Sequence, residues 1–258
     1  MPTGMSLPSF GSATSRGYRG VSKADPLGGS IVDLDLTERQ KAKLHAQTLI
    51  DAASRDLARG IVDDIGWSRR VADALASAYL LEDDPRWQSG FDGDSQLWRE
   101  ARELVVAPVN KDGTFLDIGC ATGYLMECLE VWALERGHSL IMYGLELSPA
   151  LVAAARQRTP AWASHIVEGN VLDWVPPRRF TFVHTGLEYV PASRQSWLVR
   201  HLLDEFVESG GRLIVGPVTQ AELRANRAAF QAAAASPEAS DYTDHNGKTR
   251  HVLWCSRE

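Results

Sequence analysis

The sequence predicts an α/β protein built on a mostly parallel sheet, and the segment from Phe115 to Tyr124 is its clearest element. An apolar run there ends in Asp117, small residues follow at three alternate positions, and a helical pattern continues through Leu125 and Trp132. This order is typical of a buried strand, a tight turn and the start of a helix. Downstream, strand-like and helix-like segments alternate, which favours parallel strands joined by helices.

Length and composition narrow the class of protein. The 258 residues suit one α/β domain with additions, and 27 basic against 33 acidic side chains, without a long basic run, disfavour a nucleic-acid partner. The cysteines (Cys120, Cys128 and Cys255) show no metal-ligand spacing and suit a reducing compartment. Neither a secretory signal nor an apolar run of ~18 residues is present, so we expect a cytoplasmic protein without a membrane partner.

The N-terminal third is expected to hold a flexible tail and a helical cap. Residues 1–30 are rich in Gly, Ser and Pro, which predicts the tail, and 31–109 form the cap. Its first helix begins at Thr37, where Gln40 completes a capping box, and the second begins near Ser68. We expect these helices to pack on each other, and they could also serve as a lid or a homodimer surface.

A third helix is expected before the first strand, capped by Asp94 or Ser95. Trp98 and Arg102 lie four residues apart and therefore share a face of this helix. They are interpreted as part of a lid over a substrate, with a core tryptophan and a solvated arginine as the alternative.

The remaining strands are expected at 139–145, 164–167, 180–184 and 212–215. Glu146 follows the first of these, and Ser148-Pro149 then starts a helix. A helix from Ser193 to the Gly210-Gly211 pair and a second capping box at Thr219 precede an Asn246-Gly247 hairpin turn.

The run Asp117-Ile118-Gly119-Cys120-Ala121-Thr122-Gly123 resembles the nucleoside-binding loop of class I S-adenosylmethionine-dependent methyltransferases, acid-x-Gly-x-Gly-x-Gly. Ala121 replaces the middle glycine. The resemblance covers 110–258 and implies a seven-stranded, mostly parallel, doubly wound sheet with an antiparallel last strand. It implies S-adenosylmethionine as the cofactor. The cofactor-binding residues that it implies are Asp117, Gly119, Cys120, Ala121, Gly123, Glu146, Leu147, Asn170, Val171 and His184.

Within that resemblance, Glu146 is expected to accept the ribose hydroxyls, while Asn170 and the backbone of Val171 meet the adenine. Asp173 takes the place of Asn170 if the register is shifted. A dinucleotide-binding dehydrogenase fits less well, because its Gly-x-Gly-x-x-Gly pattern needs glycine where Ala121 and Tyr124 stand.

The segment after the fourth strand faces the transferred methyl group in the family. It has no Asn/Asp-Pro-Pro-Tyr/Phe motif, no Pro-Cys pair and no carboxylate cluster suited to magnesium. His184 is the first candidate for a catalytic base, with Tyr189 and Glu188 after it, and its alternative roles are structural or cofactor-binding.

The implied reaction is methyl transfer to an O, N or C nucleophile of a small molecule, in the manner of bacterial secondary metabolism. The acceptor is expected between the end of the fourth strand and the N-terminal helices. An RNA or protein methyltransferase and a non-catalytic S-adenosylmethionine-binding module are the alternatives.

Overall fold

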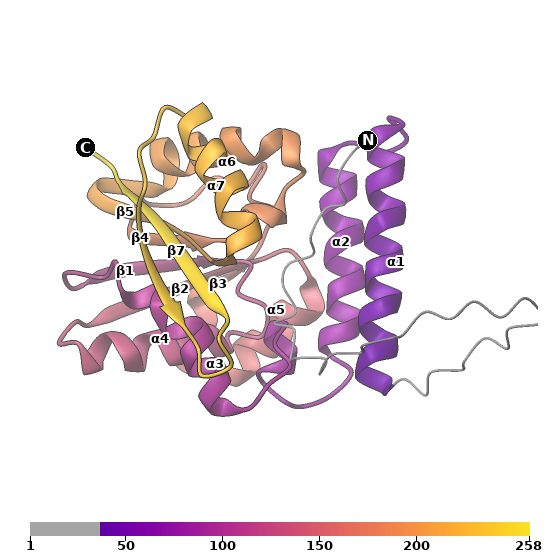
Figure 1. Cartoon of the computed structure of the whole chain (residues 1–258), viewed down its shortest axis with the longest axis horizontal. Helices are drawn as coiled ribbons and strands as arrows, with labels where there is room; N and C mark the ends of the chain where they lie inside the picture. Colours follow the sequence, from indigo (N-terminus) through magenta and orange to yellow (C-terminus); the bar gives the residue numbers. More distant parts are fainter. Residues whose placement is uncertain (1–36) are drawn as a thin grey trace, which may run out of the picture.

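A computed structural model describes residues 37–258, so the tail expected over 1–30 lies outside the described residues. Its centre is a seven-stranded sheet in the order β3-β2-β1-β4-β5-β7-β6 (Figure 1). β7 runs antiparallel to β5, and β6 antiparallel to β7, while the other neighbours are parallel. The predicted doubly wound sheet with an antiparallel last strand is therefore confirmed. The strands are β1 (Gly113–Ile118), β2 (Leu140–Glu146), β3 (Ile166–Glu168), β4 (Phe180–Thr185), β5 (Val207–Thr219), β6 (Glu238–Thr243) and β7 (Thr249–Ser256).

Alternate residues of each central strand enter two separate cores. In β1, Phe115 packs into the core beneath α3 and α4, whereas Leu116 packs into the core beneath α6 and α7. This alternation follows from the two-residue period of a strand covered on both faces. The helices that cover the sheet are α3 (Ser95–Arg102), α4 (Tyr124–Glu135), α5 (Pro149–Arg158), α6 (Gln195–His201) and α7 (Gln220–Ala232).

The strand order reverses beside β1, which lies between β2 and β4. Parallel pairing places Asp117 of β1 directly beside His184 of β4. In open α/β sheets ligands bind at the carboxyl ends of the strands where the order reverses. The fold therefore places the loop after β1 at the expected binding edge.

Two segment boundaries differ from the sequence expectation. A short 3-10 helix, Pro160–His165, precedes β3, so that strand begins at Ile166 rather than at residue 164. β5 begins already at Val207, because Gly210 and Gly211 pair with Arg257 in the sheet instead of ending a helix.

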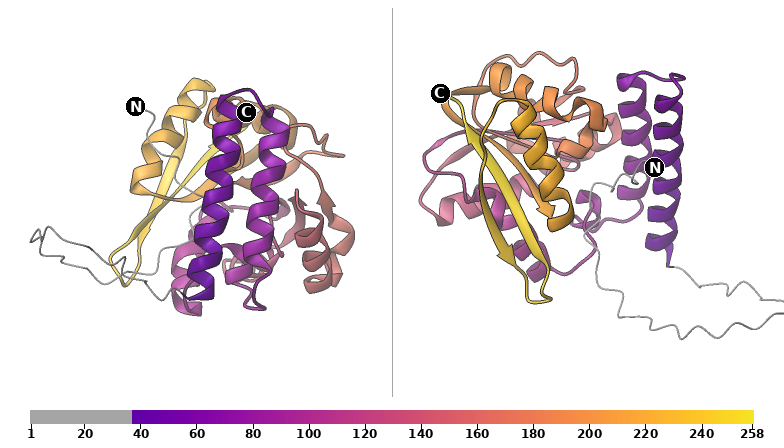
Figure 2. Two further views of the ribbon diagram at one scale, coloured as in Figure 1. Left: turned by 90° about the vertical axis from the view of Figure 1, so that its right-hand side faces the viewer. Right: turned by 45° about the horizontal axis from the view of Figure 1, so that its top comes forward.

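The helical pair α1 (Glu38–Ala58) and α2 (Asp64–Tyr79) stands beside the sheet domain (Figures 1 and 2). The capping box of Thr37 and Gln40 is present as predicted. The second helix begins earlier than expected, because Asp63 accepts a hydrogen bond from the Gly66 N–H at 2.7 Å and caps the first turn. No helix among residues 37–258 is long and apolar enough to cross a bilayer.

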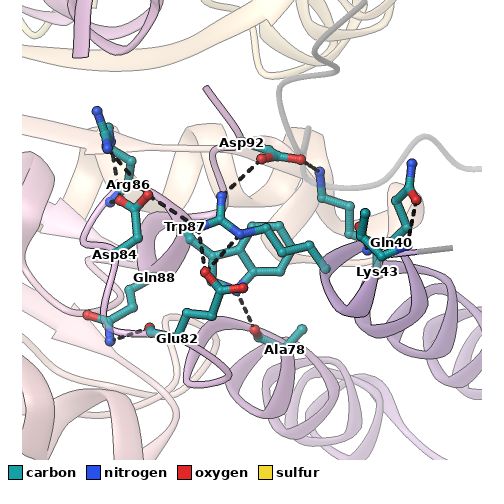
Figure 3. Close-up of polar contacts among 11 residues, drawn as sticks. Gln40, Lys43, Ala78, Glu82, Asp84, Arg86, Trp87, Gln88 and Asp92 are labelled. Atoms are coloured by element: carbon teal, nitrogen blue, oxygen red, sulfur yellow. Dashed lines mark hydrogen bonds and ion pairs between the residues drawn. The ribbon is translucent and has the colours of Figure 1, made fainter. Parts of the chain in front are cut away.

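An ionic latch holds the start of α1 to the loop after α2 (Figure 3). Arg39 donates to Glu82 and Asp92, and the Lys43 ammonium lies 3.0 Å from a carboxylate oxygen of Asp92. Both cations lie over the ring of Trp87, which is fully buried and donates to the Ala78 carbonyl at 2.7 Å (Figure 3). We call Arg39, Lys43, Glu82, Asp84 and Asp92 the latch.

Replacing Arg39 by Gln is expected to lower the melting temperature by a few degrees at neutral pH, because Glu82, Asp84 and Asp92 each lose an ion pair with Arg39. The hydrogen bond from Arg39 lowers the pKa of Glu82. A lowered folded pKa means that this stability is fully present above the ordinary pKa and is lost as pH falls from there through the lower, folded pKa. Thermal melts should therefore show the two proteins converging below about pH 4.5. Arg70→Gln, which removes the exposed pair with Asp56, is the control with a smaller effect.

Candidate functional site

The loop after β1 takes left-handed backbone at its three small residues. The φ angles are 80° at Gly119, 48° at Ala121 and 78° at Gly123. For Ala121 this conformation costs roughly 1–2 kcal/mol relative to ordinary helical backbone. A Cβ on Gly119 would lie 2.6 Å from the Tyr189 ring, so this position needs glycine for space as well as for conformation. Gly123 is the N-cap of α4.

Glu146 at the end of β2 ties two loops together. Its Oε2 accepts from the Ala121 N–H at 3.0 Å and its Oε1 from the Ser148 N–H at 2.9 Å. The side chain is buried, and burial raises the pKa of this carboxyl, whereas the backbone hydrogen bonds lower it. Each carboxylate oxygen keeps one lone pair for a ligand hydroxyl.

A cleft of about 760 Å³, counting its open mouth, lies between α2 and the ends of β1 to β3. We call it the outer cleft. Val71, Leu75 and Tyr79 of α2 form one wall, and sequence reasoning missed them because helical periodicity does not show what a face will cover. The predicted residues that line the outer cleft are Gly119, Ala121, Glu146, Leu147, Asn170, Val171 and Tyr189.

Asn170 lines the outer cleft, and its side-chain amide has an unused donor. Its Oδ1 accepts from the Leu172 N–H at 3.0 Å, and its buried Nδ2 has no hydrogen-bond partner within the described part of the chain. A buried polar atom without a partner is costly and calls for a ligand or water. Asp173 is exposed and does not line the cleft, so the register with Asn170 is the one that the fold places there.

His184 lies buried between two hydrogen-bond acceptors. Its Nδ1 is 2.7 Å from Asp117 Oδ1, and its Nε2 is 2.5 Å from the Gly216 carbonyl oxygen. Both ring nitrogens are therefore engaged by oxygen atoms of the protein. In this geometry neither ring nitrogen can accept a proton from a substrate. The second oxygen of Asp117, Oδ2, is buried and has no partner among residues 37–258.

A second hollow, of about 620 Å³ with its opening included, continues from the outer cleft past Gly119 and Tyr189. We call it the inner cavity. The residues that line it and come from the predicted sites are Trp98, Arg102, Asp117, Gly119, Cys120, Ala121, His184 and Tyr189. Gly123 is the one predicted site residue that is absent from the linings of both hollows.

The loop after β4 gives the inner cavity its titratable groups. Glu188 lines the cavity and forms no ion pair with any residue that the structure describes. Burial raises its pKa, and Glu222 raises it further, while His184 and Arg102 lower it. Burial and then Glu188 raise the pKa of the Tyr189 phenol well above its usual value, so this phenol is held neutral.

Trp98 belongs to the core, whereas Arg102 lines the inner cavity. Trp98 is buried, stacks edge-on to Phe91 at 5.5 Å and contacts Tyr124, so its ring belongs to the core. The Arg102 guanidinium lies over Trp98, with its Cζ 5.4 Å from the ring centroid, and faces the inner cavity. The pair presents one stacked cation at the cavity wall.

Comparison with known proteins places this arrangement in a fold family. No protein-family model matches the sequence. No curated protein matches it either. The magnesium protoporphyrin IX methyltransferase of Synechocystis PCC 6803, solved with bound S-adenosylmethionine, is 18% identical at a TM-score of 0.51, over 76% of this chain and 98% of that one. A chain from the complex between the Haloferax volcanii Trm112 methyltransferase activator and the putative methyltransferase is 14% identical at a TM-score of 0.52, over 72% and 98%.

The chain thus has the class I methyltransferase fold, as its loop predicted. At these identities the likeness concerns the fold, and the site must be argued from its own residues.

Proposed function

We propose that this protein is an S-adenosylmethionine-dependent methyltransferase that acts on a small molecule. The observation that carries the proposal is the meeting of the outer cleft and the inner cavity at Gly119, Ala121 and Tyr189. One hollow suits a nucleoside, and the other suits an amino-acid end and an acceptor. The methyltransferase fold places both at the carboxyl edge of the sheet.

The polar atoms along the joined hollows fit the cofactor. The unpartnered Asn170 Nδ2 offers a donor to a ring nitrogen of adenine, and the free lone pairs of Glu146 suit ribose hydroxyls. The unpartnered Asp117 Oδ2 offers an acceptor for an ammonium group. Adenine lies at one end of S-adenosylmethionine and an ammonium group at the other, so these residues fit the cofactor.

When bound, the cofactor supplies a methyl group activated by a sulfonium. The protein positions the nucleophile and, where the nucleophile carries a proton, accepts that proton. We assign proton removal to Glu188, because it is the carboxylate of the inner cavity that forms no ion pair with the described residues. We assign positioning to His184, which holds the Asp117 carboxylate and the Gly216 turn together.

A small-molecule acceptor is supported by the shape and charge of the site. The inner cavity is a pocket walled by α3 and by the loops after β1, β4 and β5, rather than an extended groove. The acidic balance of the chain also disfavours a polyanionic acceptor. We propose a cytoplasmic enzyme of secondary metabolism as the setting.

Replacing Glu146 by Ala is expected to weaken S-adenosylhomocysteine binding by roughly 1.5–3 kcal/mol, the scale of hydrogen bonds to a charged group. Calorimetry on the folded variant measures this. Glu168→Ala is a matched control, since Glu168 pairs with Glu146 in register but is exposed and lines neither hollow. Unchanged affinity in the Glu146 variant would remove the ribose assignment.

Native mass spectrometry with S-adenosylmethionine, followed by a consumption screen against metabolite extracts, tests the function as a whole. Cofactor binding together with methylation of a metabolite supports the proposal. Turnover only with RNA or protein extracts favours a macromolecular acceptor. Binding without turnover in any extract favours a non-catalytic module.

A further inference from the structure

The inner cavity contains an arginine that lacks an acidic partner. The Cζ of Arg102 lies 5.4 Å from the Trp98 ring centroid and 5.5 Å from that of Phe91. Within residues 37–258, no hydrogen bond or ion pair joins its guanidinium to a carboxylate. The two rings orient the planar group, so a ligand that binds it loses little additional side-chain freedom.

A second arginine lies close to the first. Arg250 on β7 is only 5% exposed, and its Nε has no hydrogen-bond partner among the described residues. Burial lowers the pKa of Arg102, and the nearby charge of Arg250 lowers it further. A half-buried and a buried guanidinium group near each other are costly without an anion.

The described groups around Arg102 do not neutralise this charge directly. Glu188 lines the same cavity, but it makes no ion pair with Arg102, and burial raises its pKa. Burial also raises the pKa of both Tyr79 and Tyr189, so these phenols remain neutral. The cavity therefore offers positive charge and N–H donors to whatever enters it.

We propose that Arg102 forms a carboxylate-binding site in the inner cavity. A planar guanidinium matches a carboxylate with two parallel hydrogen bonds. A single negative charge suits the site better than a phosphate dianion, because Glu188 stands near. The carboxylate belongs either to the amino-acid end of the cofactor or to the acceptor, and this site rests on the proposed function.

Calorimetry separates the two sources with four probes: S-adenosylhomocysteine, methylthioadenosine (which lacks the amino-acid end), benzoate and uncharged benzamide. The last two are titrated in the presence of methylthioadenosine. The variants are Arg102→Gln and Arg102→Lys. Arg99→Gln is the control, since Arg99 lies on the same helix but is half exposed and pairs with Glu103 and Glu135.

If the cofactor supplies the carboxylate, Arg102→Gln weakens S-adenosylhomocysteine by about 10–100-fold and leaves methylthioadenosine unchanged. If the acceptor supplies it, Arg102→Gln removes benzoate binding and leaves S-adenosylhomocysteine and benzamide unchanged. Arg102→Lys should recover part of either loss, because it keeps the charge but not the planar fork. Arg99→Gln should match the wild type throughout.

Equal affinity of wild type and Arg102→Gln for all four probes overturns the site. If the wild type binds neither S-adenosylhomocysteine nor methylthioadenosine, the proposed function is overturned. The comparison with benzoate then decides the carboxylate site by itself. Should Arg102→Gln not fold, Arg102→Lys provides the comparison, with a smaller loss expected because the charge is kept and the planar fork is not.

Discussion

Replacing Glu188 by Gln is expected to reduce methyl transfer by about 10²–10⁴-fold, the usual contribution of a positioned base. The carboxylate lines the inner cavity beside His184, and the amide that replaces it keeps its shape but cannot accept the proton. Turnover is measured with the acceptor from the extract screen. Cofactor affinity should hardly change, because the substitution leaves Asp117, Glu146 and Asn170 in place.

The same substitution is expected to stabilise the protein at neutral pH. Burial raises the pKa of Glu188, so the folded state favours its protonated form. A raised acid pKa lowers stability progressively as pH rises from the ordinary value through the folded one. The Glu188→Gln variant does not lose this stability, because an amide does not ionise. Denaturant unfolding at several pH values should therefore show its advantage growing above about pH 4.5.

The pH dependence of the rate supplies an independent check. Wild-type turnover should fall as pH decreases through the raised pKa of Glu188, and this limb should vanish in Glu188→Gln. Glu130→Gln is the matched control, since burial also raises the pKa of Glu130 but its helix face lies outside both hollows. A full rate in Glu188→Gln would show that proximity alone activates the acceptor.

Replacing His184 by Ala is expected to destabilise the protein by roughly 3–5 kcal/mol, because it leaves the buried Asp117 carboxylate without its side-chain partner. Denaturant unfolding measures the loss. Cofactor affinity should fall together with turnover, since the freed Asp117 no longer holds its position. The double variant with Asp117→Ala should cost less than the sum of the two single changes.

A different outcome would restore the role that the sequence first suggested. If His184→Ala loses turnover by ~10²–10⁴ while cofactor affinity stays constant, His184 is the base. His165→Ala serves as the control, because its ring contacts the Met142 carbonyl and the Tyr143 face and His165 lines neither hollow. That variant should lose stability modestly and leave binding unchanged.

The sequence alone determined the binding edge of the sheet. An apolar run predicted the first strand, and the spacing of small residues after Asp117 predicted the turn, because backbone conformation depends on local chemistry. The capping residues Thr37 and Thr219 were equally local and equally readable. Two predicted boundaries were wrong. At Asp63 a side-chain cap changed the local preference, and at Gly210 a backbone partner on Arg257 did so.

Only the tertiary structure decided which partners the side chains of the site have. The sequence made His184 a candidate base, but the Gly216 carbonyl, 32 residues away, takes its second nitrogen. The sequence placed Arg102 on one helix face together with Trp98. In the fold, its guanidinium lies over the rings of Phe91 and Trp98, and Arg250 is near. Protonation and pairing depend on what lies across the cavity, and residue spacing along one chain carries no record of that.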